Sequence, residues 1–176
     1  HHGDFDPHVW LDPENAKIEM EAIRDALCAA DPENATVFQS NYEKYAAELD
    51  ALDAEFREKL APLPNRTIVV AHEAFGYLCD AYGLTQVGIE GLSPDSEPDP
   101  GRMAEVIDFV REHSISTIFF EELVSPKVAE AIASETGAQA KMLSPLEGLS
   151  DEQAAAGADY FSVMHDNLAA LMEALK

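Results

Sequence analysis

A histidine stands at the end of a short β-branched run, where a parallel sheet would present it to solvent. His72 follows the run from Thr67 to Ala71, which is typical of a buried strand. In open α/β sheets, ligands bind beyond the carboxyl ends of the strands, so a polar residue there is placed for function. The alternative is a histidine that only caps the following helix. Position alone favours the functional interpretation.

A second histidine, His8, lies in the sequence Asp6-Pro7-His8-Val9-Trp10, directly before a predicted helix. Proline restricts the backbone and Trp10 is a bulky anchor, so we expect a rigid turn. Alone, His8 would be better explained as a surface-loop residue. Two histidines on rigid turns nevertheless suggest a metal site, because imidazole is a favoured ligand of Zn²⁺.

Carboxylates follow two of the predicted strands. Glu121 and Glu122 come after the apolar run from Thr117 to Phe120, and Glu147 lies in the loop after the last strand. Each could supply an oxygen to a metal at the same edge, although Glu122 and Glu147 could equally be solvated loop residues. Paired carboxylates also suit glycoside hydrolysis. Neighbouring residues on a strand point to opposite faces, which weakens that alternative.

Other catalytic motifs are excluded by spacing. A zincin motif starting at His72-Glu73 would need a second histidine one helical turn later, and Gly76 occupies that place. The chain has no G-x-S-x-G, C-x-x-C or glycine-rich phosphate loop. His113 and His165 fall within predicted helices, which indicates structural roles.

Two Asp-Pro pairs begin the helices that precede the strands. Asp12 can cap a helix that starts at Pro13 and ends before Asp31. The next helix has an apolar stripe down to about Pro62, and at 1.5 Å per residue it would be roughly 40 Å long. A helix of this length suggests a bridge across a molecule.

Strands and helices alternate after Pro64. Strands are predicted at residues 67–71, 86–89, 117–120 and 141–143, and the final helix should run from the Ser150/Gln153 capping box towards Lys176. This pattern predicts an α/β fold: a long bridging helix followed by a parallel-sheet (β/α)4 lobe. We expect a remnant of a preceding lobe at residues 1–32, the bridging helix at 33–62 and the lobe at 63–176.

The composition narrows the possible partners. Lys and Arg number 11 against 34 Asp and Glu, a net charge of −23. A chain this acidic repels phosphate backbones, so we expect no nucleic acid partner. Two separated cysteines, Cys28 and Cys79, form neither a zinc cluster nor a disulfide framework. No run approaches the roughly 20 apolar residues of a membrane helix.

The motifs, in this order, resemble the zinc/manganese class of ABC-transporter solute-binding proteins, especially its zinc-specific branch. The matching segments are DPHVWLDP (6 to 13), VVAHEAFGYL (69 to 78), the SPDSEPDPGRM loop, TIFFEELVSP (117 to 126), SPLEGL (144 to 149) and DYFSVMHDNLAAL (159 to 171). HHGDFDPH also resembles the end of the histidine-rich loop of zinc-specific members.

The resemblance implies a two-lobe protein joined by one long helix, with metal bound between the lobes. It implies that His8 and His72 are ligands, that Glu147 is a third ligand, and that a further histidine belongs to an amino-terminal lobe absent here. The family captures metal outside the cytoplasmic membrane, in the periplasm or on the cell surface, sometimes lipid-anchored, and delivers it to a membrane permease. No bond is made or broken, so we expect no enzyme.

Three alternatives remain open from the sequence. A manganese-binding or adhesin-type relative would share these motifs, although His72 stands where manganese-type members tend to have a carboxylate, which favours Zn²⁺ over Mn²⁺. A hydrolase would require Glu121, Glu122 and His72 to converge in one pocket. An interaction module would dimerise through the exposed apolar stripe of the long helix.

Overall fold

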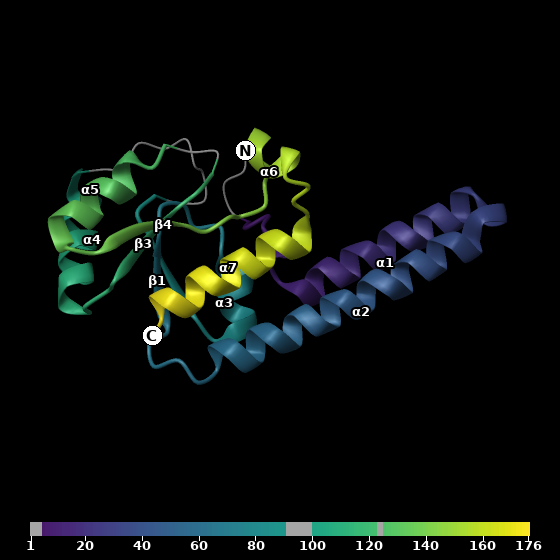
Figure 1. Ribbon diagram of the computed structural model, residues 1–176, viewed down its shortest axis with the longest axis horizontal. Coiled ribbons are helices and arrows are strands. Elements are labelled where there is room, and N and C mark those ends of the chain that lie inside the picture. The colour runs from purple at the N-terminus through teal and green to yellow at the C-terminus, as the bar shows by residue number, and fades with distance from the viewer. Residues whose placement is uncertain (1–4, 91–99, 123–124) are drawn as a thin grey trace.

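The described part of the chain forms a four-stranded parallel sheet with helices packed on it, and a helical hairpin extends away from this part (Figure 1). The computed structural model describes residues 5–90, 100–122 and 125–176. Most of the SPDSEPDPGRM loop and the first histidines of HHGDFDPH lie outside these residues. The α/β class predicted from the strand and helix alternation is confirmed.

The strands are β1 (Thr67–Val70), β2 (Thr85–Gly88), β3 (Thr117–Phe120) and β4 (Gln139–Met142). Their order in the sheet is β2-β1-β3-β4, and every neighbouring pair is parallel. The chain therefore moves outwards from β1 to β2 and then returns to place β3 on the other side of β1. The carboxyl ends of β1 and β3 flank this switch point, which is where open α/β sheets bind ligands.

Helices cover both faces of the sheet, because the apolar side chains of its central strands point alternately to one face and to the other. Ile68 and Val70 of β1 pack into a core with α3 (Gly76–Tyr82), α7 (Tyr160–Ala174) and the end of α2. Val69 packs on the opposite face with α4 (Pro100–Glu112) and α5 (Lys127–Thr136). Successive side chains of a strand point to opposite faces, so one apolar run supplies two cores.

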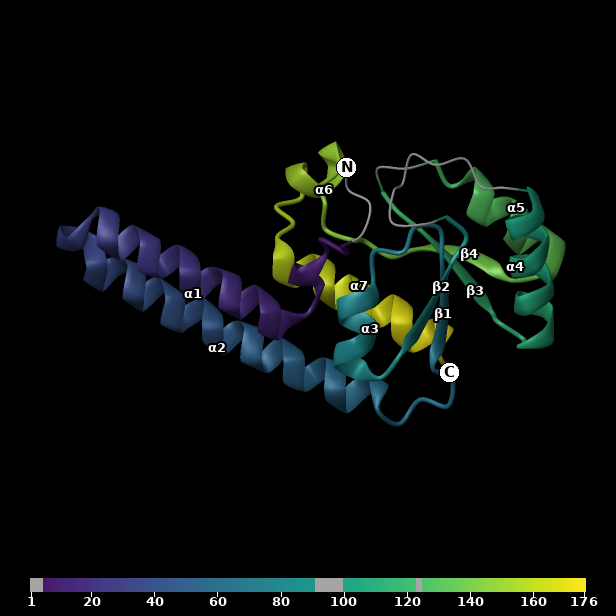
Figure 2. The same ribbon diagram turned by 180° about the vertical axis from the view of Figure 1, so that it is seen from behind.

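The hairpin consists of α1 (Pro13–Ala30) and α2 (Ala35–Leu60), which lie side by side in both views (Figures 1 and 2). The short 3₁₀ turn η2 (Pro32–Asn34) joins them, and Asp12 caps α1 by accepting a hydrogen bond from the Glu14 amide at 3.0 Å. Only the second half of α2 buries its stripe, from Ala46 to Leu60. The first half leaves apolar side chains at the surface. Within the described residues, no helix combines the length and apolar character that a membrane crossing requires.

The prediction of one final helix is wrong. The capping box of Ser150 and Gln153 is present, but it starts only the short helix α6 (Asp151–Ala155). Gly157 then adopts a φ of +75°, a left-handed conformation that ends the helix. Asp159 and Ser162 form a second capping box that starts α7. The chain between the two helices therefore turns at Gly157, in a backbone conformation that glycine adopts more readily than other residues.

Candidate metal centre

Three predicted ligands come together at the carboxyl edge of the sheet. His8, His72 and Glu147 each offer one ligand atom, and these atoms lie within 4.8 Å of one another. The rings of His8 and His72 meet edge to face with centroids 5.0 Å apart. Both histidines are 1% exposed. The side chains span 139 residues of sequence and belong to three different loops.

His8 is held by hydrogen bonds to Asp6, two residues earlier. Asp6 Oδ1 accepts hydrogen bonds from the His8 backbone amide at 3.0 Å and from its ring Nδ1 at 2.6 Å. The other oxygen, Asp6 Oδ2, lies 2.7 Å from the place where a β-carbon on Gly76 would stand. Gly76 thus lets the Asp6 carboxylate approach the start of α3. The position of the Asp6 carboxylate beside His8 therefore depends on the absence of a side chain at Gly76.

His72 is held by a carboxylate from the neighbouring strand. Its Nδ1 lies 2.8 Å from Glu121 Oε1, and Glu121 is only 4% exposed. Val70 of β1 pairs with Phe119 of β3, so His72 and Glu121 each follow their paired residue by two positions. The Ala71 amide donates to the Phe119 carbonyl at 2.9 Å and extends the ladder to the site. Strand register therefore sets this pair.

Glu147 lies in a loop that is hydrogen-bonded to α7. Asn167 of α7 accepts from the Ser144 amide and donates to the Ser144 carbonyl, both at 2.8 Å. The Ser144 hydroxyl in turn accepts from the Leu146 amide at 3.1 Å. Leu146 has a φ of +55°, a left-handed conformation that costs energy in a residue with a β-carbon. The turn brings Glu147 Oε1 to 2.8 Å from His8 Nε2.

The turn that bears His8 is tied to the same loop and to α7. Trp10, in the 3₁₀ turn η1 (Val9–Leu11), donates its indole N–H to the Pro145 carbonyl at 2.8 Å. Tyr160 of α7 donates its hydroxyl to the Trp10 carbonyl at 2.7 Å. Leu11 is fully buried and packs in the same hydrophobic cluster as residues of α3 and α7. Residues 6–11 are therefore held against the Glu147 loop and α7, and are not a loose tail.

A further carboxylate lies close to the His72–Glu121 pair. Burial raises the pKa of Glu90, and the nearby negative charge of Glu121 raises it further, while His72 opposes the shift. A carboxyl with a raised pKa takes up a proton more readily than a solvated one. The edge of the sheet thus concentrates acidic groups around the two histidines.

The hydrolase alternative required Glu121, Glu122 and His72 to converge. Glu121 bonds His72, but Glu122 accepts a hydrogen bond from the Ser144 hydroxyl, and its Oε2 is buried without a partner among the described residues. The two carboxylates therefore serve different neighbours, as expected for adjacent residues at the end of a strand. Neither Glu121 nor Glu122 belongs to the cluster of three ligand atoms.

The remaining histidines of the described chain lie elsewhere. His113, just after α4, donates through Nδ1 to the Phe109 carbonyl at 3.0 Å, and His165 lies 3.4 Å from Glu55 at the surface. The orienting roles of Asp6 and Glu121 were not predicted from the sequence. The position of Asp6 two residues before a candidate ligand was a usable signal for the first. The Glu121 pairing needed the order of the strands.

Comparison with known proteins identifies the family of the chain. The family model described as ZnuA, zinc-uptake complex component A periplasmic, matches residues 1–174. The zinc-binding lipoprotein AdcA of Streptococcus pneumoniae is 43% identical over 173 residues, which are 98% of this chain and 34% of that protein. The chain therefore spans about a third of that relative.

Solved structures give the same result. The Zn(II)-bound ZnuA-like domain of Streptococcus pneumoniae AdcA has a TM-score of 0.85 and 42% identity, covering 98% of this chain and 65% of that one. The laminin-binding protein Lmb of Streptococcus agalactiae, described as a bifunctional protein with adhesin and metal transporting activity, has a TM-score of 0.90 and 38% identity, with 98% and 65% covered. Because the family model matches nearly the whole chain, the protein belongs to the ZnuA family of zinc-uptake components.

Proposed function

We propose that the protein binds Zn²⁺ through His8, His72 and Glu147. The observation that carries this proposal is the convergence of one donor atom from each residue within 4.8 Å. Zn²⁺ is bound tetrahedrally by imidazole nitrogens and carboxylate oxygens, and this set supplies two nitrogens and one oxygen. One position would remain for water or for another donor. Such a site captures metal without making or breaking bonds.

Zn²⁺ is favoured over Mn²⁺ by the donor set. Imidazole suits zinc, whereas manganese prefers carboxylates, carbonyls and water. The relatives support the same ion, since AdcA is named a zinc-binding lipoprotein and its solved domain is Zn(II)-bound. Manganese binding, or an adhesin role like that in the name of Lmb, is the second candidate. Competition between Zn²⁺ and Mn²⁺ for the chain separates the two ions.

For the whole protein we propose the role of a solute-binding component that captures zinc outside the cytoplasmic membrane and delivers it to an ABC-transporter permease. The family description as a periplasmic zinc-uptake component and the lipoprotein name of AdcA support this location. We further propose that residues 63–176 form one lobe of a two-lobe protein, that 33–62 bridge the lobes and that 1–32 belong to the other lobe. The metal would then lie between the lobes.

Calorimetric titration of Zn²⁺ into the 176-residue chain tests the site. We expect one ion per chain, bound weakly because only three donors are supplied. His72→Ala should weaken binding by more than the roughly 10- to 100-fold caused by losing a group that only supports a ligand. His165→Ala is the matched control, since His165 is half exposed and lies beside Glu55, away from the cluster. Equal affinities of the wild type and His72→Ala would contradict the site.

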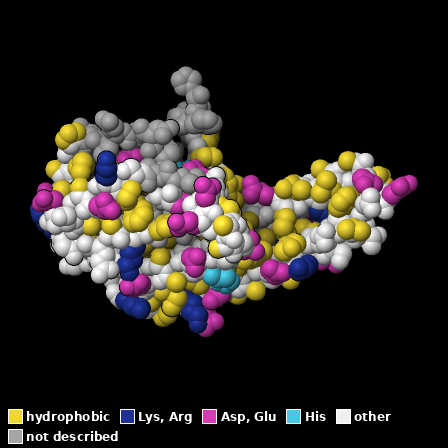
Figure 3. All heavy atoms as spheres, turned by 45° about the horizontal axis from the view of Figure 1, so that its top comes forward, with side chains coloured by type: hydrophobic (Ala, Val, Ile, Leu, Met, Phe, Trp, Pro, Cys, Tyr) yellow, Lys and Arg dark blue, Asp and Glu magenta, His cyan; other side chains and the backbone are white. Residues whose placement is uncertain are grey.

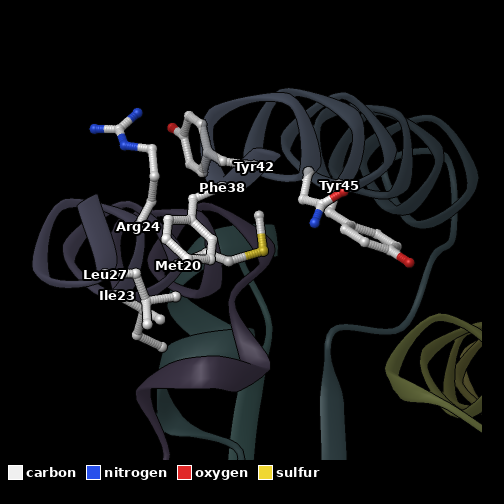
Figure 4. A pocket seen from close by; sticks show the side chains of 8 residues that line it. Met20, Ile23, Arg24, Leu27, Phe38, Tyr42 and Tyr45 are labelled. Carbon is white, nitrogen blue, oxygen red and sulfur yellow. The ribbon is translucent and has the colours of Figure 1, made fainter. Parts of the chain in front are cut away.

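The exposed hairpin supports a second proposal, self-association of this chain. Ile23 and Leu27 of α1 are 59% and 43% exposed, and hydrophobic side chains gather along the hairpin in Figure 3. Side chains of α1 and α2 line a groove of about 150 Å³ between the helices, with Phe38 facing Met20 (Figure 4). Exposed apolar surface of this kind marks interaction sites. The partner proposed is a second copy of the chain.

A further inference from the structure

A buried carboxylate behind His72 is the feature of the site that metal binding itself does not explain. Glu121 is 4% exposed, and a carboxylate that deep is costly unless it is paired and hydrogen-bonded. Its Oε1 lies 2.8 Å from Nδ1 of His72 and it contributes no donor atom to the three-residue cluster. Its contact with the metal site therefore runs through the His72 ring.

We propose that Glu121 is a positioning residue, which holds His72 in the tautomer that carries its proton on Nδ1 and presents the Nε2 lone pair to the metal. The inference rests on the proposed function, because it assigns a role toward the same site. A neutral imidazole has one donor nitrogen and one acceptor nitrogen, and a carboxylate can only accept. Bonding to Glu121 therefore fixes Nδ1 as the donor and leaves Nε2 as the ligand atom.

The fold makes this orientation rigid. His72 and Glu121 follow the central strands β1 and β3 at matching positions beyond the Val70–Phe119 pair. The Ala71 amide bonds the Phe119 carbonyl at 2.9 Å, which fixes the backbone beside both residues. A carboxylate that accepts the far N–H of a metal-binding histidine also makes the ligand nitrogen more basic. Glu121 thus couples ring orientation and ligand strength to the register of the sheet.

The chain offers a matched control. Glu55 lies 3.4 Å from Nδ1 of His165, so it is also a carboxylate beside a histidine ring. That pair is 40% and 50% exposed and lies outside the ligand cluster. Glu55→Gln removes the same charge as Glu121→Gln without touching His72.

The first test is the ¹⁵N spectrum of the histidine side chains in the metal-free chain, at about pH 8, where an ordinary histidine is neutral. We expect His72 in the Nδ1–H form in the wild type and in Glu121→Gln, because the amide oxygen still accepts. Glu121→Leu should lose this preference. An Nε2–H form in the wild type, or an unchanged His72 signal in Glu121→Leu, would overturn the proposal.

The second test is zinc affinity. We expect Glu121→Leu to bind about 10- to 100-fold more weakly and Glu121→Gln to be intermediate, with Glu55→Gln equal to the wild type. Affinities of the Glu121 variants equal to the wild type, or an equal loss in Glu55→Gln, would overturn the role of Glu121. If Glu121→Leu fails to fold, the comparison of Glu121→Gln with the wild type and Glu55→Gln decides. A wild type that binds no zinc refutes the proposed function, while the metal-free spectrum still tests Glu121.

Discussion

At the scale of single residues, each candidate histidine ligand is hydrogen-bonded to a carboxylate. His8 is held by Asp6 and His72 by Glu121, each through Nδ1. Both pairs leave the Nε2 nitrogens for other contacts, and Nε2 of His8 lies 2.8 Å from Glu147. Metal-binding histidines commonly donate their second N–H to a carboxylate, which fixes ring orientation. The two carboxylates therefore define how the histidines face the centre.

Gly76 provides a test of the Asp6 contact. A β-carbon at this position would lie 2.7 Å from Asp6 Oδ2, too close for an ordinary contact. We expect Gly76→Ala to push the Asp6 carboxylate away from the His8 ring and to weaken zinc binding up to about 10-fold, at the low end of the range for supporting groups. Calorimetry measures the change.

Gly137 supplies the comparison for that variant, because nothing lies within 4 Å of a β-carbon there. Its φ of +80° strains any side chain, so Gly137→Ala should lower stability without changing zinc affinity. A Gly76→Ala chain with wild-type zinc affinity would show that the Asp6 contact is unimportant for the site.

At the scale of elements, three strand ends and one turn converge because the sheet is parallel. The carboxyl ends of β1, β3 and β4 lie at one edge, and they lead to His72, Glu121 and Glu147. The turn with His8 reaches the same edge through the Trp10–Pro145 and Tyr160–Trp10 hydrogen bonds. The helix α7 therefore supports the site through two residues, Tyr160 and Asn167.

Asn167 is the element-scale test of this support. It is 3% exposed and makes hydrogen bonds to both the backbone amide and the backbone carbonyl of Ser144. Asn167→Leu would leave a buried amide and a buried carbonyl unpaired, at about 1–3 kcal/mol each. We expect a loss of at least about 2 kcal/mol in the free energy of unfolding, measured with urea, and weaker zinc binding because the Glu147 loop is released.

Asn41 is exposed on the hairpin and lines the groove there. Asn41→Leu is the control, for which we expect unfolding and zinc binding close to those of the wild type. An Asn167→Leu chain as stable as that control would mean that the Ser144 backbone finds other partners.

At the scale of the whole molecule, the proposed metal centre lies where the hairpin meets the lobe. His8 immediately precedes the turn into α1, while His72 and Glu147 belong to the lobe. A bound ion would tie the base of the hairpin to the sheet. The far part of the hairpin remains exposed and apolar, against a net charge of −23 for the chain. Attraction through apolar surface and repulsion through charge therefore oppose each other.

Light scattering measures the balance. We expect the average mass to rise with protein concentration and with salt, because salt screens the repulsion between acidic chains. Ile23→Glu with Leu27→Glu should keep the chain monomeric. Met142→Glu is the control, since Met142 is 44% exposed on β4, away from the hairpin. A monomer at all concentrations and salt levels would refute self-association through the hairpin.

The amino-acid sequence alone determined the α/β class, the long helix and the candidate donors. Periodicity and the Asp-Pro helix starts are local signals, and His72 at the end of an apolar run is a local signal too. The break between α6 and α7 at Gly157 was missed because the apolar pattern continues across it. The left-handed backbone of Gly157 is seen only in the folded structure. The start of β4 was also earlier than predicted, at Gln139, on the edge of the sheet.

Only the tertiary structure decided which groups meet. Whether Glu121 or Glu122 joins the histidines depends on which side of β1 the strand β3 lies and on its register, and neither is written in local sequence. The distance between His8 and Glu147 depends on hydrogen bonds from Trp10, Tyr160 and Asn167, which join residues distant in the chain. Local propensity selects the elements, but contacts between them place the donor atoms.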